Sequence, residues 1–235
     1  MLVLTPELLL CAYGIGMFPM ANDRNDPTVH WIDPIRRGVL PLPSLHVPRR
    51  LRKTVRRRPY ELKVNAAFAR VIQTCAEPTP ERPRTWLNED LIRVYVQLHH
   101  RGHAHSVECW QDDKLVGGLY GISMGSAFFG ESMFSRERDA SKIALVELAA
   151  RLTNAGFILF DTQFVTDHLK QFGAREMPRP HYRQLLDQAL MQERVFPSKP
   201  DWFSGPYLDS LASGGSSDDE SGSSIGFKQS ITQTS

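Results

Sequence analysis

Residues 157–160 restrict the fold of this chain more than any other segment. Phe157, Ile158, Leu159 and Phe160 are apolar at consecutive positions, so a strand over residues 157–164 has two apolar faces. Such a strand needs cover on both sides, which places it inside a sheet that lies between layers of helices. We therefore expect an α/β (α+β) protein with a mixed sheet between helices.

Caps, turns and periodicity predict the remaining elements. Thr5 before Pro6 is typical of a helix start, and Asn65 and Asn88 are expected to cap two further helices. Residues 111–113 predict a hairpin turn. The expected helices are 5–13, 65–76, 88–100, 139–154 and 180–190, and the expected strands are 105–110, 114–122, 126–135 and 157–164.

Composition divides the 235 residues into three parts. We expect a small N-terminal lobe at 1–40, irregular from residue 14 to residue 43 after its helix, then a catalytic domain at 41–210. A disordered Ser/Gly-rich tail is expected at 211–235. No run approaches the length of a membrane span, and no basic region precedes the short apolar run at 8–12, so a cytoplasmic protein without membrane contact is expected.

The three cysteines, Cys11, Cys75 and Cys109, are far apart in the sequence. Buried reduced thiols are therefore expected, in place of a disulfide framework or a zinc site. His103 and His105 share a strand face, but no third metal ligand is evident, so structural histidines are the favoured interpretation. The glycines of residues 117–121 lie within a strand and do not form a dinucleotide-binding loop.

A basic block at residues 49–58 stands out because it carries seven positive charges on a chain with a net charge of only +2. Leu51 and Val55, four residues apart, would fix one side of a helix and leave the basic side outward. Such a block is either a solvated surface or a contact for a polyanion, for which RNA is the natural candidate. The residues concerned are Arg49, Arg50, Arg52, Lys53, Arg56, Arg57 and Arg58.

Acidic side chains interrupt two of the apolar strands. Asp161 and Gln163 share one strand face, and Glu131 is expected to share a face with Phe129 and Met133. A buried carboxylate is unfavourable unless it is hydrogen-bonded or functional. Asp161 is equally well explained as a partner for backbone donors, but two such acids on neighbouring strands favour a site, and the apolar residues around them would suit a pocket.

Several motifs in order resemble the leucyl/phenylalanyl-tRNA–protein transferases, over about residues 4–203. They are Tyr-Gly-Ile-Gly-Met-Phe-Pro at 13–19, Arg-Thr-Trp at 84–86, Gly-His-Ala-His-Ser-Val-Glu at 102–108, Leu-Val-Gly-Gly-Leu-Tyr-Gly at 115–121, Phe-Gly-Glu-Ser-Met-Phe-Ser-Arg at 129–136 and Asp-Thr-Gln at 161–163. The sequence departs from the family at Met20, where tryptophan is usual, and at Thr162, where a small or sulfur-containing residue is commoner.

The resemblance implies a catalytic domain similar to the GNAT-type acetyltransferases. It also implies transfer of Leu or Phe, and sometimes Met, from aminoacyl-tRNA to proteins that begin with Arg or Lys, which marks them for degradation in the N-degron pathway. No metal or other cofactor is implied. The implied catalytic pair is Asp161 and Gln163, the implied aminoacyl pocket holds Glu131, Met133, Phe128 and Ser132, and the implied adenosine site holds Tyr13, Trp86 and Tyr95.

The expected chemistry is aminolysis of an ester that is already activated, so positioning of the two substrates is the main task. The attacking α-amino group has a pKa near 8 and is mostly protonated at neutral pH. Asp161 could accept its proton or only anchor it, and Asp161→Ala is expected to abolish transfer without unfolding the protein. Two rival functions are a CoA-dependent N-acetyltransferase, although residues 135–141 lack glycine for its phosphate loop, and a non-catalytic RNA-binding module.

Overall fold

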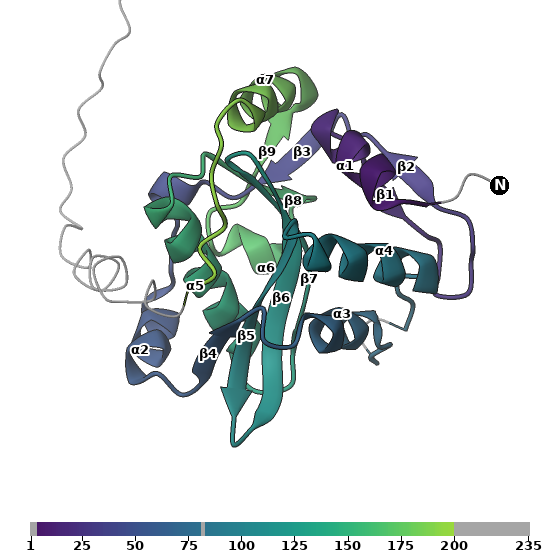
Figure 1. The fold of residues 1–235 in the computed structure, drawn as a ribbon. Helices are drawn as coiled ribbons and strands as arrows, with labels where there is room; N and C mark the ends of the chain where they lie inside the picture. Colours follow the sequence, from purple (N-terminus) through teal and green to yellow (C-terminus); the bar gives the residue numbers. More distant parts are fainter. Residues whose placement is uncertain (1–3, 81–82, 200–235) are drawn as a thin grey trace, which may run out of the picture.

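A seven-stranded mixed sheet forms the centre of the protein, in the order β4-β5-β6-β7-β8-β3-β9 (Figure 1). The computed structural model describes residues 4–80 and 83–199, so the expected tail at 211–235 lies outside the described residues. Within the sheet, β7 and β8 pair in parallel and the other neighbours are antiparallel. The strands are β3 Arg36–Val39, β4 Glu61–Val64, β5 Ala104–Gln111, β6 Lys114–Met124, β7 Ala127–Ser135, β8 Leu159–Gln163 and β9 Arg175–Pro178.

Helices pack on both faces of this sheet, which confirms the mixed α/β class and the interior position of β8 (Figure 1). One apolar cluster joins a sheet face to α2 (Arg49–Arg57) and α5 (Ala140–Asn154). The other cluster joins the opposite face to α1 (Pro6–Gly14), α3 (Phe68–Ala76), α4 (Glu89–His100) and α7 (Arg179–Leu190). Among the described helices, none combines the length and the apolar character that crossing a bilayer requires.

Two of the three predicted helix caps are confirmed. The Thr5 side chain accepts a hydrogen bond from the Leu8 amide, and the Asn88 side chain accepts one from Leu91. The prediction that Asn65 caps a helix is wrong, because α3 begins only at Phe68. Asn65 instead has a positive φ of 58°, and its amide contacts His105 and the backbone of Ser106 on β5.

The predicted hairpin is confirmed in its turn, since β5 and β6 are joined at Asp112 and Asp113, both with positive φ. The prediction of three buried thiols is wrong for Cys11. Cys75 and Cys109 are buried, but Cys11 is exposed because it faces outward from α1.

The segment after α1 is more regular than the sequence predicts. β1 (Phe18–Met20) and β2 (His30–Ile32) form a small two-stranded sheet, and β3 (Arg36–Val39) enters the main sheet between β8 and β9. The expectation of irregular chain through residue 43 is therefore wrong. Strands of three or four residues are too short to show an alternating pattern in the sequence. Their stability comes mainly from pairing with the strands beside them, which the sequence does not reveal.

A β-bulge on β7 changes the predicted faces of that strand. Tyr120 of β6 pairs with Ser132, and the next residue, Gly121, pairs with Gly130, so Glu131 is the extra residue. The side chains that follow Glu131 therefore lie on the opposite face of the sheet from the one that simple alternation predicts. Phe129 belongs to the cluster with α4, whereas Met133 packs against the cluster with α5, so the prediction that they share a face is wrong.

Candidate active site

A cavity of about 470 Å³ opens beside the region where β7 and β8 run in parallel. Its wall is largely apolar on the side formed by the sheet, α5 and α6 (Asp167–Lys170). Residues of that wall are Leu119, Met133, Leu145, Leu148, Phe160 and Leu169. A second group of lining residues comes from β1 and from the segment before α4. Its members are Phe18, Pro19, Met20 and Trp86.

Glu131 reaches this cavity from the bulge of β7. The Tyr13 hydroxyl lies 2.7 Å from Glu131 Oε1, and the Tyr95 hydroxyl lies 2.9 Å from Oε2, both within hydrogen-bond distance. Burial raises the pKa of Glu131 to about 7, although both hydrogen bonds act in the opposite direction. The carboxyl group can therefore gain or lose a proton near neutral pH.

Asp161 lies behind the cavity and is fully buried in β8. Its carboxylate accepts hydrogen bonds from Arg37 at 2.7–3.0 Å, from the Tyr182 hydroxyl at 2.6 Å and from the backbone N–H of Gln163 at 2.8 Å. A carboxylate offers about four lone-pair positions, and these donors occupy them. Asp161 does not line the cavity wall.

Arg37 connects three parts of the chain around Asp161. Its guanidinium carbon lies 4.5 Å from the centre of the Phe18 ring and 4.7 Å from that of Tyr182, and Nη1 donates to the Gly16 carbonyl at 2.8 Å. Burial is the largest influence on the pKa of Arg37 and lowers it, but the charge and hydrogen bonds of Asp161, with Tyr182 and Tyr13, together outweigh burial and raise the pKa. Arg37 therefore stays charged in the interior.

Gln163 brings a polar side chain into this site. It lines the cavity in a backbone conformation with φ of 57°, beside a register shift between β3 and β8. Its Nε2 is buried and has no hydrogen-bond partner among the described residues. A buried donor without an acceptor is unfavourable, so this atom is suited to bind a ligand.

His168 also lines the cavity, from α6, and its Nε2 is likewise buried without a partner in the described part of the chain. Burial, with Lys142 nearby, lowers the pKa of His168 and keeps the imidazole neutral. The sequence gives little warning of this role, because His168 lies in a four-residue helix that no periodic pattern reveals.

The structure brings most of the predicted site residues to one place. Glu131, Ser132, Met133, Gln163 and Trp86 line the cavity, whereas Phe128 lies in the core, where its ring centre is 5.6 Å from that of Phe160. Tyr13 and Tyr95 support Glu131 from behind, as Asp161 supports Gln163.

Sequence reasoning missed Arg37, Tyr182 and His168. A buried acid needs hydrogen-bond donors or a cation, which indicates that a side chain such as an arginine lies near Asp161. The sequence does not reveal which one, because 124 positions separate Arg37 from Asp161.

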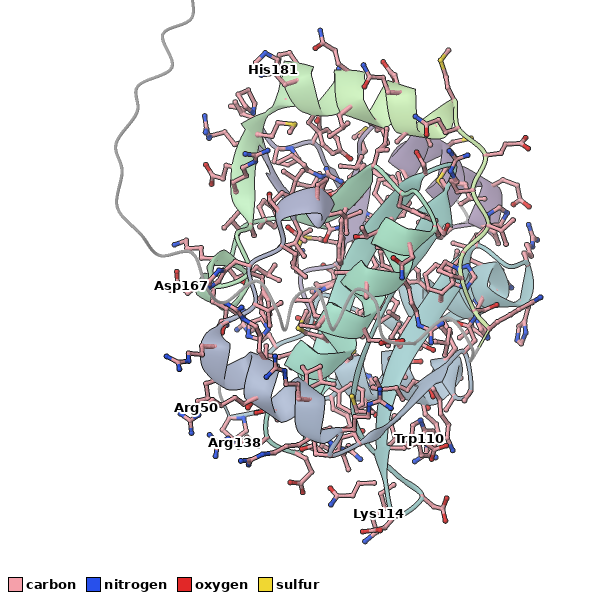
Figure 2. All side chains as sticks on the ribbon, turned by 90° about the vertical axis from the view of Figure 1, so that its left-hand side faces the viewer. Arg50, Trp110, Lys114, Arg138, Asp167 and His181 are labelled. Atoms are coloured by element: carbon pink, nitrogen blue, oxygen red, sulfur yellow. The ribbon has the colours of Figure 1, made fainter. Side chains whose placement is uncertain are left out.

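The basic block forms α2, as its pattern predicts, with Leu51 and Val55 buried. Arg49, Arg50 and Lys53 are exposed, and Figure 2 shows Arg50 on the surface with Arg138 on the same side. The basic face is thus available to a polyanion.

Comparisons with known proteins agree with this arrangement. The family model described as leucyl/phenylalanyl-tRNA protein transferase matches residues 39–187, and the model of that family's N-terminal domain matches residues 3–35. The chain is 54% identical to a protein of Paramagnetospirillum magneticum (82% of this chain, 92% of the relative) and 58% identical to one of Phenylobacterium zucineum (77% and 82%). A protein of Maricaulis maris is 54% identical (85% and 92%), and all three are named leucyl/phenylalanyl-tRNA–protein transferase.

Proposed function

The chain belongs to the leucyl/phenylalanyl-tRNA–protein transferase family, and from that premise we propose that it transfers a leucyl or phenylalanyl group from tRNA to the amino terminus of an acceptor protein. The observation that carries this proposal is the cavity, in which an apolar wall adjoins Glu131 and the Gln163 Nε2 atom, which has no partner among the residues that the structure describes. A large apolar side chain fits the wall, and a reacting ester would then lie against the polar groups.

The two groups of lining residues suggest where each part of the substrate binds. Leu145, Leu148 and Leu169 would hold the aminoacyl side chain, since burial of apolar surface favours it. Trp86 offers an aromatic face at the other group, where the terminal adenosine can stack. Met20, in place of the family's usual tryptophan, lies in that group and offers less surface for stacking.

Gln163 and Asp161 take different roles in this proposal. The Gln163 side-chain amide donates to a substrate carbonyl, because its Nε2 atom has no acceptor within the described part of the chain. Asp161 is a positioning residue. Its carboxylate is occupied by Arg37, Tyr182 and the Gln163 backbone, which fix the strand that carries Gln163. Because Asp161 does not line the cavity, this positioning role is favoured over direct proton acceptance and over anchoring of the substrate amine.

The exposed face of α2 is proposed to contact tRNA phosphates. Such contacts position RNA without reading its sequence, which suits an enzyme that accepts more than one aminoacyl-tRNA. We also propose an acetyltransferase-like catalytic domain, supported by a mixed sheet whose parallel pair, β7 and β8, adjoins the cavity. The division into residues 1–40, 41–210 and 211–235 is part of the same proposal.

We propose acceptors that begin with Arg or Lys, use of Met as a further transferred residue, and degradation of the modified protein as the outcome. These three features follow from the family resemblance, and the motifs at residues 129–136 and 161–163 support them. Charged tRNA is a cytoplasmic molecule, so the reaction is placed in the cytoplasm.

Mass spectrometry tests the proposal directly. The protein is incubated with Leu-tRNA or Phe-tRNA and a peptide beginning with Arg, and the peptide is expected to gain one leucyl or phenylalanyl residue. A peptide with an acetylated amino terminus is the control and stays unchanged. Acetylation of the Arg peptide from acetyl-CoA, or RNA binding without any transfer, would instead support one of the two rival functions.

A further inference from the structure

Three polar groups, the hydroxyls of Tyr13 and Tyr95 and the carboxyl group of Glu131, form a closed hydrogen-bond ring beside the cavity. The hydroxyl oxygens of Tyr13 and Tyr95 lie 2.7 Å apart, Tyr13 lies 2.7 Å from Glu131 Oε1, and Tyr95 lies 2.9 Å from Oε2. Each distance is that of an O–H···O hydrogen bond, so each contact requires one hydrogen. The two hydroxyl groups supply only two.

The third hydrogen comes from the carboxyl group of Glu131. With an ionised Glu131, both hydroxyls point to the carboxylate, and the contact between Tyr13 and Tyr95 is left without a hydrogen. With a neutral Glu131, the carboxyl donates to Tyr13, Tyr13 donates to Tyr95, and Tyr95 donates to the other carboxyl oxygen. All three contacts are then satisfied, which matters because the Tyr13 and Tyr95 side chains are buried.

We infer that Glu131 is a neutral carboxylic acid in the free protein and donates its proton to the ribose oxygen that leaves as the new amide bond forms. The inference rests on the proposed transfer reaction. Glu131 is the one carboxyl group among the described residues that line the cavity, and the reacting ester would lie between the apolar wall and Trp86. A proton donor for the leaving oxygen is therefore available at this point.

The surroundings of Glu131 keep this proton available near neutral pH. Burial raises the pKa of Glu131 to about 7, the Tyr13 and Tyr95 hydroxyls lower it, Asp161 raises it and Arg37 lowers it. A general acid is most effective when its pKa lies near the working pH.

Every proton in the proposed transfer reaction has a donor and an acceptor. The acceptor's α-ammonium first loses one proton to water, and the amine then attacks the ester carbonyl. The carbon–oxygen bond to ribose breaks as Glu131 protonates that oxygen. The Glu131 carboxylate formed in this way takes the second proton from the nitrogen, which restores the acid and leaves a neutral amide. During the step, both hydroxyls can turn to the carboxylate and stabilise it.

Infrared spectroscopy tests the protonation state without any reaction. At pH 6, the carbonyl band of a neutral carboxylic acid is expected in the wild type, and Glu131→Gln should remove the part of its intensity that Glu131 contributes. The matched control is Glu147→Gln, because burial also raises the pKa of Glu147 to about 7 and Glu147 pairs with Arg151 on α5. If the wild type and Glu131→Gln have the same carboxylic acid band, the inference is wrong.

The pH dependence of transfer tests the role of Glu131 as the general acid. A required acid makes kcat fall as pH rises through the pKa of Glu131, whereas a carboxylate that binds an ammonium would make it fall as pH drops. Glu131→Gln preserves the hydrogen-bond ring through its amide group, so we expect a melting temperature no lower than that of the wild type, kcat lower by about 100-fold or more, and loss of the falling limb. A falling limb that persists in Glu131→Gln, or an unchanged kcat, overturns the inference. Absence of transfer by the wild type would instead refute the proposed function.

Discussion

Arg37 and Asp161 form a buried ion pair with N–O distances of 2.7–3.0 Å, and they join β3 to β8 directly behind the cavity. The side chains are 1% and 0% exposed, so neither charge can be compensated by water if the other is removed. This pair therefore links the stability of the protein to the geometry of its candidate active site.

Asp161→Ala is expected to abolish transfer and also to destabilise the fold, by about 3–5 kcal/mol, because it leaves the Arg37 charge buried without a partner. This differs from the expectation drawn from the sequence, in which the fold is unaffected. Urea unfolding with a parallel transfer assay measures both effects.

The double variant Arg37→Met with Asp161→Ala separates the two effects. It removes the uncompensated charge and should recover much of the missing stability, yet stay inactive because the Gln163 backbone no longer has its acceptor. Recovery of activity in the double variant would show that Asp161 has no positioning role.

Gln163→Met is expected to lower kcat/KM for transfer by at least 10-fold with almost no change in melting temperature. The side chains have similar volume, and the Gln163 Nε2 atom makes no hydrogen bond within the described residues that the variant could remove. Steady-state kinetics and calorimetry on the same preparation check this. A melting temperature that falls in step with activity would assign Gln163 to the fold alone.

Much of the fold can be predicted from the sequence, because the central elements have strong local signals. Asn88 caps α4 and the apolar run of β8 lies inside the sheet, as expected. The faces of β7 cannot be predicted, since the bulge at Glu131 depends on pairing with β6. The same holds for the site: the acids are visible as exceptions in apolar strands, but their partners Arg37, Tyr13 and Tyr95 are distant in sequence.

Glu131→Gln is expected to change how stability depends on pH. The pKa of Glu131 is raised from 4.5 to about 7 in the folded state, so the folded protein holds this proton more tightly than the unfolded chain. Its stabilising contribution is full below pH 4.5 and is lost as pH rises through 7. Relative to Glu131→Gln, the wild type should lose about 3 kcal/mol of unfolding free energy over this range, measured by urea unfolding. Parallel pH curves for the two proteins would contradict the raised pKa.

Replacing Arg50, Lys53 and Arg57 with Gln is expected to weaken aminoacyl-tRNA binding while leaving kcat almost unchanged. The three residues are exposed, and their spacing places them on one side of α2. The plot of log affinity against log salt should become shallower, by up to about 0.9 for each phosphate that the protein no longer neutralises, a value taken from DNA. The control replaces Lys114, Arg175 and Arg183, which are exposed on other elements, and removes the same charge. Equal salt slopes for the α2 variant, the control and the wild type would show that the basic face of α2 is only solvated, because a protein that neutralises fewer RNA phosphates must release fewer counterions on binding.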